Sequence, residues 1–207
     1  YSFDNEDDNG WSHFNFGFGY NRLADYTARG NYTGTSKTSM ADYFQEYANA
    51  NGPVYNYNII DDAPFDAGLA AQAGLIYLDT NANRFVSDID VLRATNSKAQ
   101  VSREYNYTRS GGMGEVDFTF AANYASRLYL GGSIGFPTIN YTEQTTIKET
   151  DNIGNIPYFQ SSQYTQNLSV SGTGVNLKIG AIFQATDWMR IGAYVHTPSW
   201  LELSESY

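Results

Sequence analysis

Very few side chains in this sequence have the chemistry of a catalytic or metal-binding group. The chain has no cysteine, so it offers no thiolate nucleophile or thiolate metal ligand and cannot form disulfides. Its two histidines, His13 and His196, have no Asp, Ser or Glu at a spacing typical of a catalytic set. We therefore predict no enzymatic activity and no cofactor.

One acidic stretch, residues 79–90, has the spacing of an EF-hand-type calcium loop. Positions 1, 3, 5, 9 and 12 of such a loop would be Asp79, Asn81, Asn83, Ser87 and Asp90. However, Arg84 stands where the sharp turn needs glycine, and Asp90 replaces the bidentate glutamate. The alternative is a turn rich in Asp and Asn that follows a helix. We predict no metal site and keep Asp79, Asn81, Asn83 and Asp90 as a weak calcium candidate.

A second group of charged residues lies on the polar sides of predicted strands. It consists of Asp117, Lys178, Arg190 and His196. These side chains could form a cluster that holds a ligand carboxylate. The alternative is that they are solvated or form pairs between strands.

The elements that would position these residues are mostly strands, because apolar and polar residues alternate along the chain. Residues 116–124 and 128–136 alternate in this way around a short turn, Ala125–Arg127, and predict an antiparallel hairpin. A second hairpin is predicted from residues 175–183 and 189–195 with a turn at 185–188. Residues 13–23 predict a further strand, and residues 142–162 a polar loop.

Between residues 24 and 104 the pattern changes to helical spacing. Ser39 can cap a helix, with Asp42 three residues later in a variant capping box, and apolar residues then recur from Met40 to Tyr47. A second helix is predicted over residues 65–77. An excursion of this length between strands is too long for an ordinary loop, so we expect it to be functional.

Composition indicates an outer-membrane protein. The formal net charge of −10 argues against nucleic acid as a partner, since nucleic-acid binding needs a basic surface. Charged residues make up only 16% of the chain, aromatic residues 16%, and glycine occurs 19 times. The two tight turns alternate with the two long connections, as in outer-membrane barrels, which have short periplasmic turns and long external loops. The expected fold is therefore all-β, a transmembrane antiparallel barrel or part of one.

Three segments carry a resemblance to a known family: SGGMGEVDFTFAANYASRLYLGGSIGFP, SGTGVNLKIGAIFQATDWMRIGAYVHTP, and FNFGFGYNRL followed by MADYFQEYANA. In this order they resemble the FadL/TodX-type outer-membrane transporters of Gram-negative bacteria. The resemblance implies a closed barrel that takes up hydrophobic compounds, such as long-chain fatty acids or aromatic hydrocarbons. The strands predicted here are too few for such a barrel, so we expect residues 1–207 to be one barrel domain and an incomplete portion of it.

In that family an external loop region forms an apolar groove, which corresponds here to residues 24–104. The resemblance makes these residues the ligand-binding candidates: Phe44, Tyr47, Phe65, Leu69, Leu75, Ile76 and Tyr77. The alternative is that they only pack two loop helices together. Asp117, Lys178, Arg190 and His196 would face the lumen. We expect a monomer in the bacterial outer membrane, in contact with lipid and a hydrophobic ligand. The alternative function is a secreted or surface-attached β-sandwich that binds glycans or peptides.

Overall fold

The computed structural model describes residues 2–3, 10–50, 59, 65–96, 99–152 and 154–207. Strands take up 65% of the described residues and helices 14%, and the strand pairings are antiparallel, which confirms the predicted all-β class. The strands are β1 (Ser2–Phe3), β2 (Trp11–Asp25), β3 (Ala28–Ser36), β4 (Tyr77–Asp79), β5 (Arg84–Val86), β6 (Val101–Tyr124), β7 (Leu128–Thr150), β8 (Ser161–Thr186), β9 (Met189–His196) and β10 (Trp200–Ser206). The helices are α1 (Met40–Ala50), α3 (Ala67–Gln72) and α4 (Asp88–Thr95).

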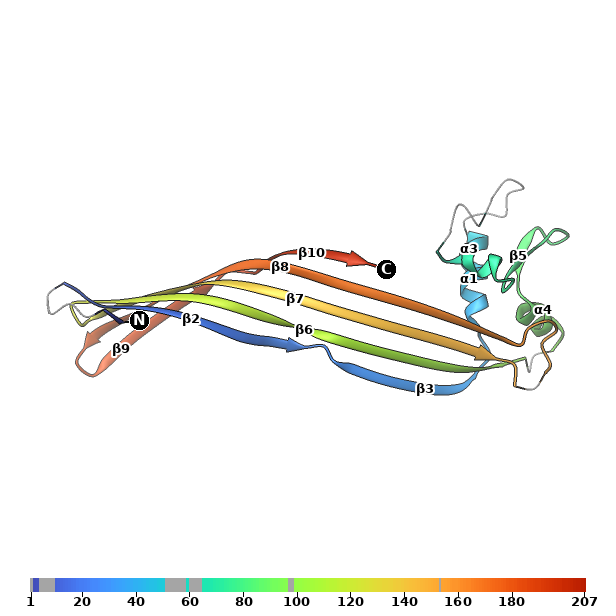
Figure 1. The fold of residues 1–207 in the computed structure, drawn as a ribbon, viewed down its shortest axis with the longest axis horizontal. Coiled ribbons are helices and arrows are strands. Elements are labelled where there is room, and N and C mark those ends of the chain that lie inside the picture. The colour runs from blue at the N-terminus through green and yellow to red at the C-terminus, as the bar shows by residue number, and fades with distance from the viewer. Residues whose placement is uncertain (1, 4–9, 51–58, 60–64, 97–98, 153) are drawn as a thin grey trace. The chain divides into compact units, whose positions relative to one another are not determined.

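Eight strands form one sheet, in which strands close in sequence are mostly neighbours (Figure 1). The order is β1-β2-β6-β7-β8-β10, with β3 paired to β6 and β9 paired to β8, while β4 and β5 form a separate hairpin. The two ends of the order, β1 and β10, do not pair with each other within the described residues. The sheet is therefore open in this part of the chain.

Both predicted hairpins are confirmed. β6 and β7 are joined by Ala125–Arg127, where Ala125 and Ser126 have φ of 49° and 52°. Positive φ at successive turn residues matches the right-handed twist of the flanking strands, although the usual Asn-Gly signal is missing here. β8 and β9 are joined by a two-residue turn at Asp187–Trp188.

The prediction of a polar loop over residues 142–162 is wrong for most of that stretch, which forms strands. β7 continues to Thr150 and β8 begins at Ser161, so the loop covers only residues 151–160. The stretch is polar on both sides, which hides the alternation that marks a strand. Its many threonines nevertheless favour extended backbone, because a β-branched side chain fits a pleated sheet.

The excursion predicted over residues 24–104 is also shorter than expected. β3 occupies Ala28–Ser36 and β6 begins at Val101. The helix expected over 65–77 is only α3, because Gly74 adopts a φ of +71° and Tyr77 already belongs to β4. Helix α4 was not predicted.

The chain divides into two compact units, which are described separately. Unit 1 comprises residues 1–29, 108–144 and 166–207, and unit 2 comprises residues 30–107 and 145–165. Every regular element in the described part of unit 1 is a strand. Large apolar side chains are exposed on one side of its sheet, here called the apolar face: Phe16, Phe18, Tyr20, Phe118, Phe120, Leu130, Ile134, Phe136, Ile179, Phe183, Ile191 and Val195.

Cross-strand pairing explains why these residues share a face. Directly opposed residues of antiparallel strands point to the same side, and Phe16 is opposed to Phe120 and Phe18 to Phe118. Rings therefore meet across strands: the centroids of Phe18 and Phe118 are 5.5 Å apart, and those of Phe118 and Phe136 are 6.0 Å apart.

Unit 2 holds a buried hydrophobic core. Its members come from α1, α3 and the β4–β5 hairpin with adjoining residues: Ala41, Phe44, Ala48, Ile59, Ala67, Ala70, Ile76 and Phe85. A smaller cluster joins Ile89 of α4, Val101 of β6 and Ile156. Among the described residues, no helix is both long and apolar enough to cross a lipid bilayer.

Candidate functional site

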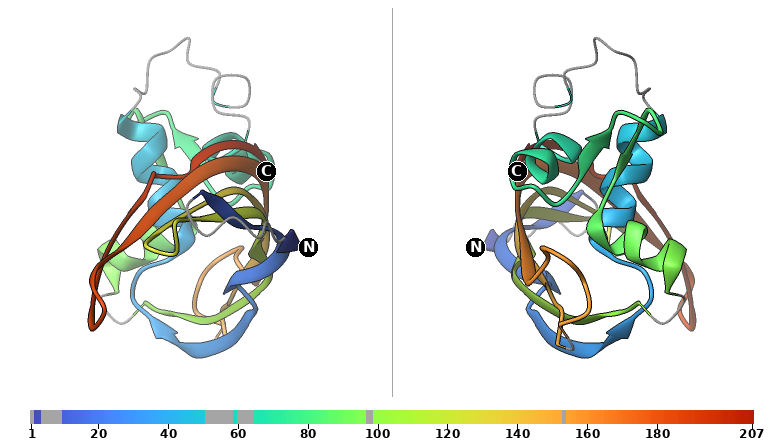
Figure 2. Two further views of the ribbon diagram at one scale, coloured as in Figure 1. Left: turned by 90° about the vertical axis from the view of Figure 1, so that its left-hand side faces the viewer. Right: turned by 90° about the vertical axis from the view of Figure 1, so that its right-hand side faces the viewer.

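A groove of about 510 Å³ lies in unit 2 among α1, α3, the start of α4 and residues 158–165. Figures 1 and 2 show these three helices next to one another. The apolar lining includes Met40, Phe44, Leu69, Leu75 and Ile89. The polar lining includes Ser87, Asp88 and residues 160–163. The apolar lining residues are here called the floor of the groove, and the polar ones its polar wall.

Helix α1 begins with the predicted capping arrangement. The backbone N–H of Ser39 donates to Oδ2 of Asp42 at 2.8 Å, and the N–H of Ala41 donates to Oγ of Ser39 at 3.1 Å. Asp42 also accepts two hydrogen bonds from the Arg93 guanidinium, at 3.1 and 3.0 Å. These contacts fix the first turn of α1 against α4.

The fully buried carboxylate of Glu149, on β7, holds the same helix end. It accepts a hydrogen bond from Oγ of Ser39 at 2.5 Å and from the backbone N–H of Met40 at 3.1 Å. The Arg103 guanidinium of β6 pairs with it at 2.6 Å. A negative charge at a helix N-terminus is favourable, so Glu149 both compensates Arg103 and anchors α1.

Three of the seven predicted ligand residues line this groove. These are Phe44, Leu69 and Leu75. The structure places the other four elsewhere: Ile76 is buried in the core, and Tyr47, Phe65 and Tyr77 are exposed outside the groove lining. Phe44 is itself buried and its ring packs on Tyr164, with centroids 5.7 Å apart, so it serves both the core and the groove floor.

Tyr77 touches the groove indirectly, through Asp88. Its hydroxyl donates to Oδ1 of Asp88 at 3.1 Å. Burial raises the pKa of the Tyr77 phenol above its usual value, and the hydrogen bond to the Asp88 carboxylate raises this pKa further. The phenol therefore stays a donor to Asp88 at neutral pH.

The weak calcium candidate has a different geometry from an EF-hand. Oδ1 of Asp79 accepts the backbone N–H groups of Asn81 and Ala82, at 2.9 and 3.1 Å, which is the Asx-type turn considered as the alternative. Asn83, with a φ of 49°, lies in the same turn between β4 and β5. Asp90 belongs to α4 and pairs with Arg84 at 3.1 Å. Within the described residues, no group of three or more acidic or histidine side chains could hold a metal ion.

Residues 158–165 were missed as part of a site because their sequence reads as a polar loop. Asp151 shapes the loop before them: its carboxylate accepts the N–H of Gly154 at 3.0 Å and of Ile156 at 2.7 Å. Tyr158 follows with a φ of +59° and a side chain that is 99% exposed at the groove. A left-handed backbone is costly for tyrosine, and no sequence signal marks it.

In unit 1 the polar side of the sheet carries a buried charged cluster. Nζ of Lys178 pairs with Oδ1 of Asp117 at 2.8 Å and with Oε1 of Glu115. Ser133 donates to Asp117 at 3.0 Å, and Asn21 donates to it at 2.9 Å. Prediction from sequence found Asp117 and Lys178 but overlooked Glu115, which lies two residues before Asp117 and hence on the same face.

The described structure shows no hydrogen bond or ion pair between this cluster and the other two predicted lumen residues. His196 is opposed to Lys178 in the β8–β9 ladder, and its side chain is exposed. Arg190 is opposed to Gln184, and its guanidinium carbon lies 5.9 Å from the ring centroid of Tyr129. By register, both residues share the face of Lys178.

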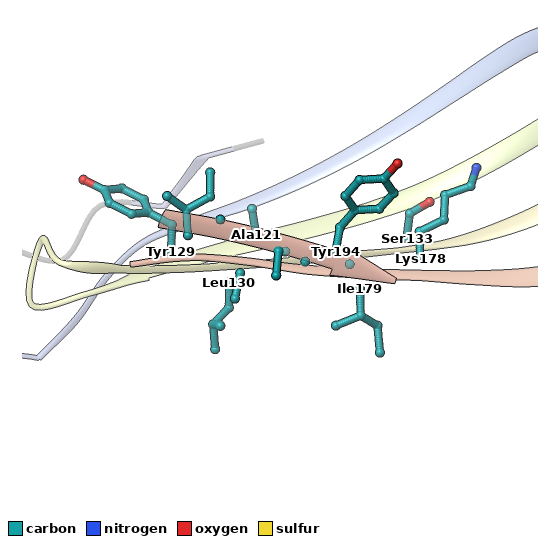
Figure 3. A pocket seen from close by; sticks show the side chains of 14 residues that line it. Ala121, Tyr129, Leu130, Ser133, Lys178, Ile179 and Tyr194 are labelled. Atoms are coloured by element: carbon teal, nitrogen blue, oxygen red, sulfur yellow. The ribbon is translucent and has the colours of Figure 1, made fainter. Parts of the chain in front are cut away.

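A hollow of about 580 Å³ lies near the cluster, where β7, β8 and β9 carry small residues such as Gly131, Gly180 and Gly192. Figure 3 shows Tyr129, Tyr194, Ser133 and Lys178 on one side of these strands, and Leu130 and Ile179 on the other.

Comparisons with protein-family models, with curated proteins and with solved structures find no match to this chain.

Proposed function

We propose that unit 1 is embedded in the bacterial outer membrane as part of a β-barrel wall, and that the protein takes up hydrophobic small molecules. The observation that carries this proposal is the apolar face. Its residues are exposed over at least five strands, with Phe18 72% exposed and Phe118 52% exposed. An exposed apolar surface that extends this far indicates contact with lipid or with another apolar partner.

The opposite face supports the same proposal. It buries Glu115 and Asp117, and Lys178 pairs with both. In membrane barrels apolar side chains face lipid while polar side chains face the lumen. A soluble β-sandwich has the reverse arrangement, because its apolar face packs against a second sheet.

A sheet in lipid must also satisfy the backbone groups of its edge strands. Unpaired N–H and C=O groups are costly where no water can reach them, so a membrane sheet has to close on itself. We therefore propose that the open sheet belongs to a closed barrel. The groove of unit 2 would then capture the hydrophobic molecules before they enter it.

Extraction of the native protein tests the membrane part of this proposal. We expect the protein in the outer-membrane fraction, released only by detergent, and with a mobility in SDS gels that changes on heating. A protein that is soluble in buffer alone would contradict the proposal and would support the β-sandwich binding module.

Bound lipids test the transport part. We expect hydrocarbons or other long-chain hydrophobic compounds to co-purify with the protein and to be found by mass spectrometry. Leu69→Asp should reduce them, because Leu69 lines the groove and is 48% exposed, so the substitution does not breach the core. Val91→Asp is the matched control, since Val91 is also 48% exposed in unit 2 but lies outside the groove.

A further inference from the structure

The charges around the groove of unit 2 restrict what its polar wall can bind. Among the described residues that line it, Asp88 is the one ionised side chain, and the remaining polar ones are neutral Ser, Thr, Gln and Tyr. No Lys, Arg or His is among these described lining residues. The described part of the lining therefore has a negative charge and no cation.

The arginines of unit 2 for which the structure shows a salt bridge serve other carboxylates. Arg84 pairs with Asp90 at 3.1 Å, Arg93 with Asp42 at 3.0 Å, and Arg103 with Glu149 at 2.6 Å. Moving one of them to the groove would leave its carboxylate without the charge that compensates it. For the pair of Arg103 with the fully buried Glu149 this would be especially costly.

An anionic ligand head would thus lose water without gaining a cation. Desolvation of a carboxylate is unfavourable unless an opposite charge or enough donors replace the water, and among the described lining residues only neutral Ser, Thr, Gln and Tyr side chains could donate. Asp88 adds repulsion at short range. A head that donates a hydrogen bond avoids both costs, because the Asp88 carboxylate has acceptor capacity beyond the bond from Tyr77.

We propose that the groove binds long-chain molecules whose polar end donates a hydrogen bond and carries no negative charge, and that it discriminates against free carboxylates. Fatty alcohols and alkylamines belong to this class. The apolar chain would lie on Phe44, Leu69 and Leu75, with the polar end at Asp88. This inference rests on the proposed capture of hydrophobic molecules and narrows their chemistry.

Three ligands with one chain length test the proposal: dodecan-1-ol, dodecylamine and dodecanoate. Their binding to the whole chain, held in an amphipol, would be measured by equilibrium dialysis of radiolabelled compounds at a pH of about 8, where the carboxylate is ionised. We expect dodecanoate to bind about tenfold more weakly than the other two, as one unfavourable charge contact near a protein surface predicts. Equal or tighter binding of dodecanoate would overturn the proposal.

Substitution of Asp88 tests whether its negative charge causes the weaker binding of dodecanoate. Asp88→Asn should strengthen dodecanoate binding and weaken dodecylamine binding, each about fivefold, while dodecan-1-ol binding changes by less than about twofold. Asp88→Glu keeps the charge and should keep the original order. Unchanged discrimination in Asp88→Asn would contradict the role of Asp88.

Leu69→Asp separates this inference from the proposed function. It should weaken the binding of all three ligands, whereas Val91→Asp should leave them unchanged. If none of the three binds, or if Leu69→Asp has no effect, the groove does not capture hydrophobic molecules. If all three ligands bind equally and Leu69→Asp weakens their binding, the groove does capture hydrophobic molecules, but the proposed preference for an uncharged or cationic polar end is wrong.

Discussion

In unit 1 the large exposed side chains include phenylalanines and isoleucines, and the buried ones on the opposite face include Glu115 and Asp117. In unit 2 the relation is reversed: Phe44, Ile76 and Phe85 are buried together between helices and a small hairpin. Large apolar side chains are therefore exposed in unit 1 and buried in unit 2. Unit 2 follows the rule for folding in water, and unit 1 has the arrangement that the proposed membrane barrel requires.

The buried carboxylates of the two units also differ in the groups that compensate their charge. Glu115 and Asp117 share one cation, Lys178, with neighbouring Asn and Ser side chains as additional donors. Glu149 in unit 2 has Arg103 and the N-terminus of α1. The cluster of unit 1 holds strands of one sheet together, whereas that of unit 2 attaches a helix to a sheet.

The largest effect is expected from Lys178→Met, which leaves Glu115 and Asp117 buried without a cation. Removing one partner of a buried pair costs about 3–5 kcal/mol. Lys178 is partly exposed, so we expect the lower end of that range in the free energy of unfolding, measured by urea in lipid vesicles. Adding Glu115→Gln and Asp117→Asn should recover most of the loss. No recovery would mean that Lys178 acts through its aliphatic chain and not its charge.

The second-largest effect is expected from an arginine substitution on the apolar face, which tests whether this face contacts lipid. Phe118→Arg should destabilise the vesicle-embedded protein by about 2–4 kcal/mol, the cost of arginine on the lipid side of a barrel near its midplane. Tyr43→Arg is the matched control in unit 2, because Tyr43 is 59% exposed and surface substitutions usually change stability by less than about 0.5 kcal/mol. Similar small effects at both positions would show that the apolar face is in water.

The sequence was sufficient to predict elements whose pattern has one unambiguous period. Both hairpins and α1 belong to this group, because alternation from Val116 to Phe136 and the cap at Ser39 are local signals. The stretch from Thr142 to Thr150 was missed because its residues are polar on both sides. Its strand state depends on pairing with distant strands and on the burial of Glu149, which no local pattern reports.

The candidate site was predictable only in part, for a similar reason. Phe44, Leu69 and Leu75 lie on segments that were expected to be helical, and it was the resemblance to the transporter family that made them ligand-binding candidates. Asp88 and Tyr158 come from segments read as a turn and a loop, and they reach the groove only through tertiary structure. The resemblance also assigned Ile76 to the ligand, although tertiary packing buries it in the core.

Tyr158→Gly should stabilise unit 2 slightly. Glycine adopts a positive φ without the clash that tyrosine suffers, and this relief is worth about 1 kcal/mol. The ring of Tyr158 is fully exposed, so little packing is lost with it. Tyr158→Ala removes the ring but keeps the strained backbone, and it should not stabilise. Equal stability of the two variants, measured by thermal unfolding, would contradict the strain argument.

The smallest effect is a pH dependence from Tyr77. Burial and the hydrogen bond to Asp88 raise the pKa of this phenol in the folded protein, whereas an unfolded tyrosine titrates near pH ~10. At a pH between the pKa of the unfolded tyrosine and the higher pKa of the folded one, the unfolded chain has released the proton and the folded chain still holds it. The stabilisation is therefore complete below about pH 10 and is lost as the pH rises through the folded pKa.

Tyr77→Phe removes this titration, so the variant should lose less stability than the wild-type protein as the pH rises above about 10. Ultraviolet absorbance of the phenolate should show, by difference between the two proteins, one tyrosine with a raised midpoint. Identical pH dependence in both would mean that Tyr77 is solvated in the folded protein. In that case Asp88 would lack its donor, and the polar wall of the groove would carry a more accessible negative charge.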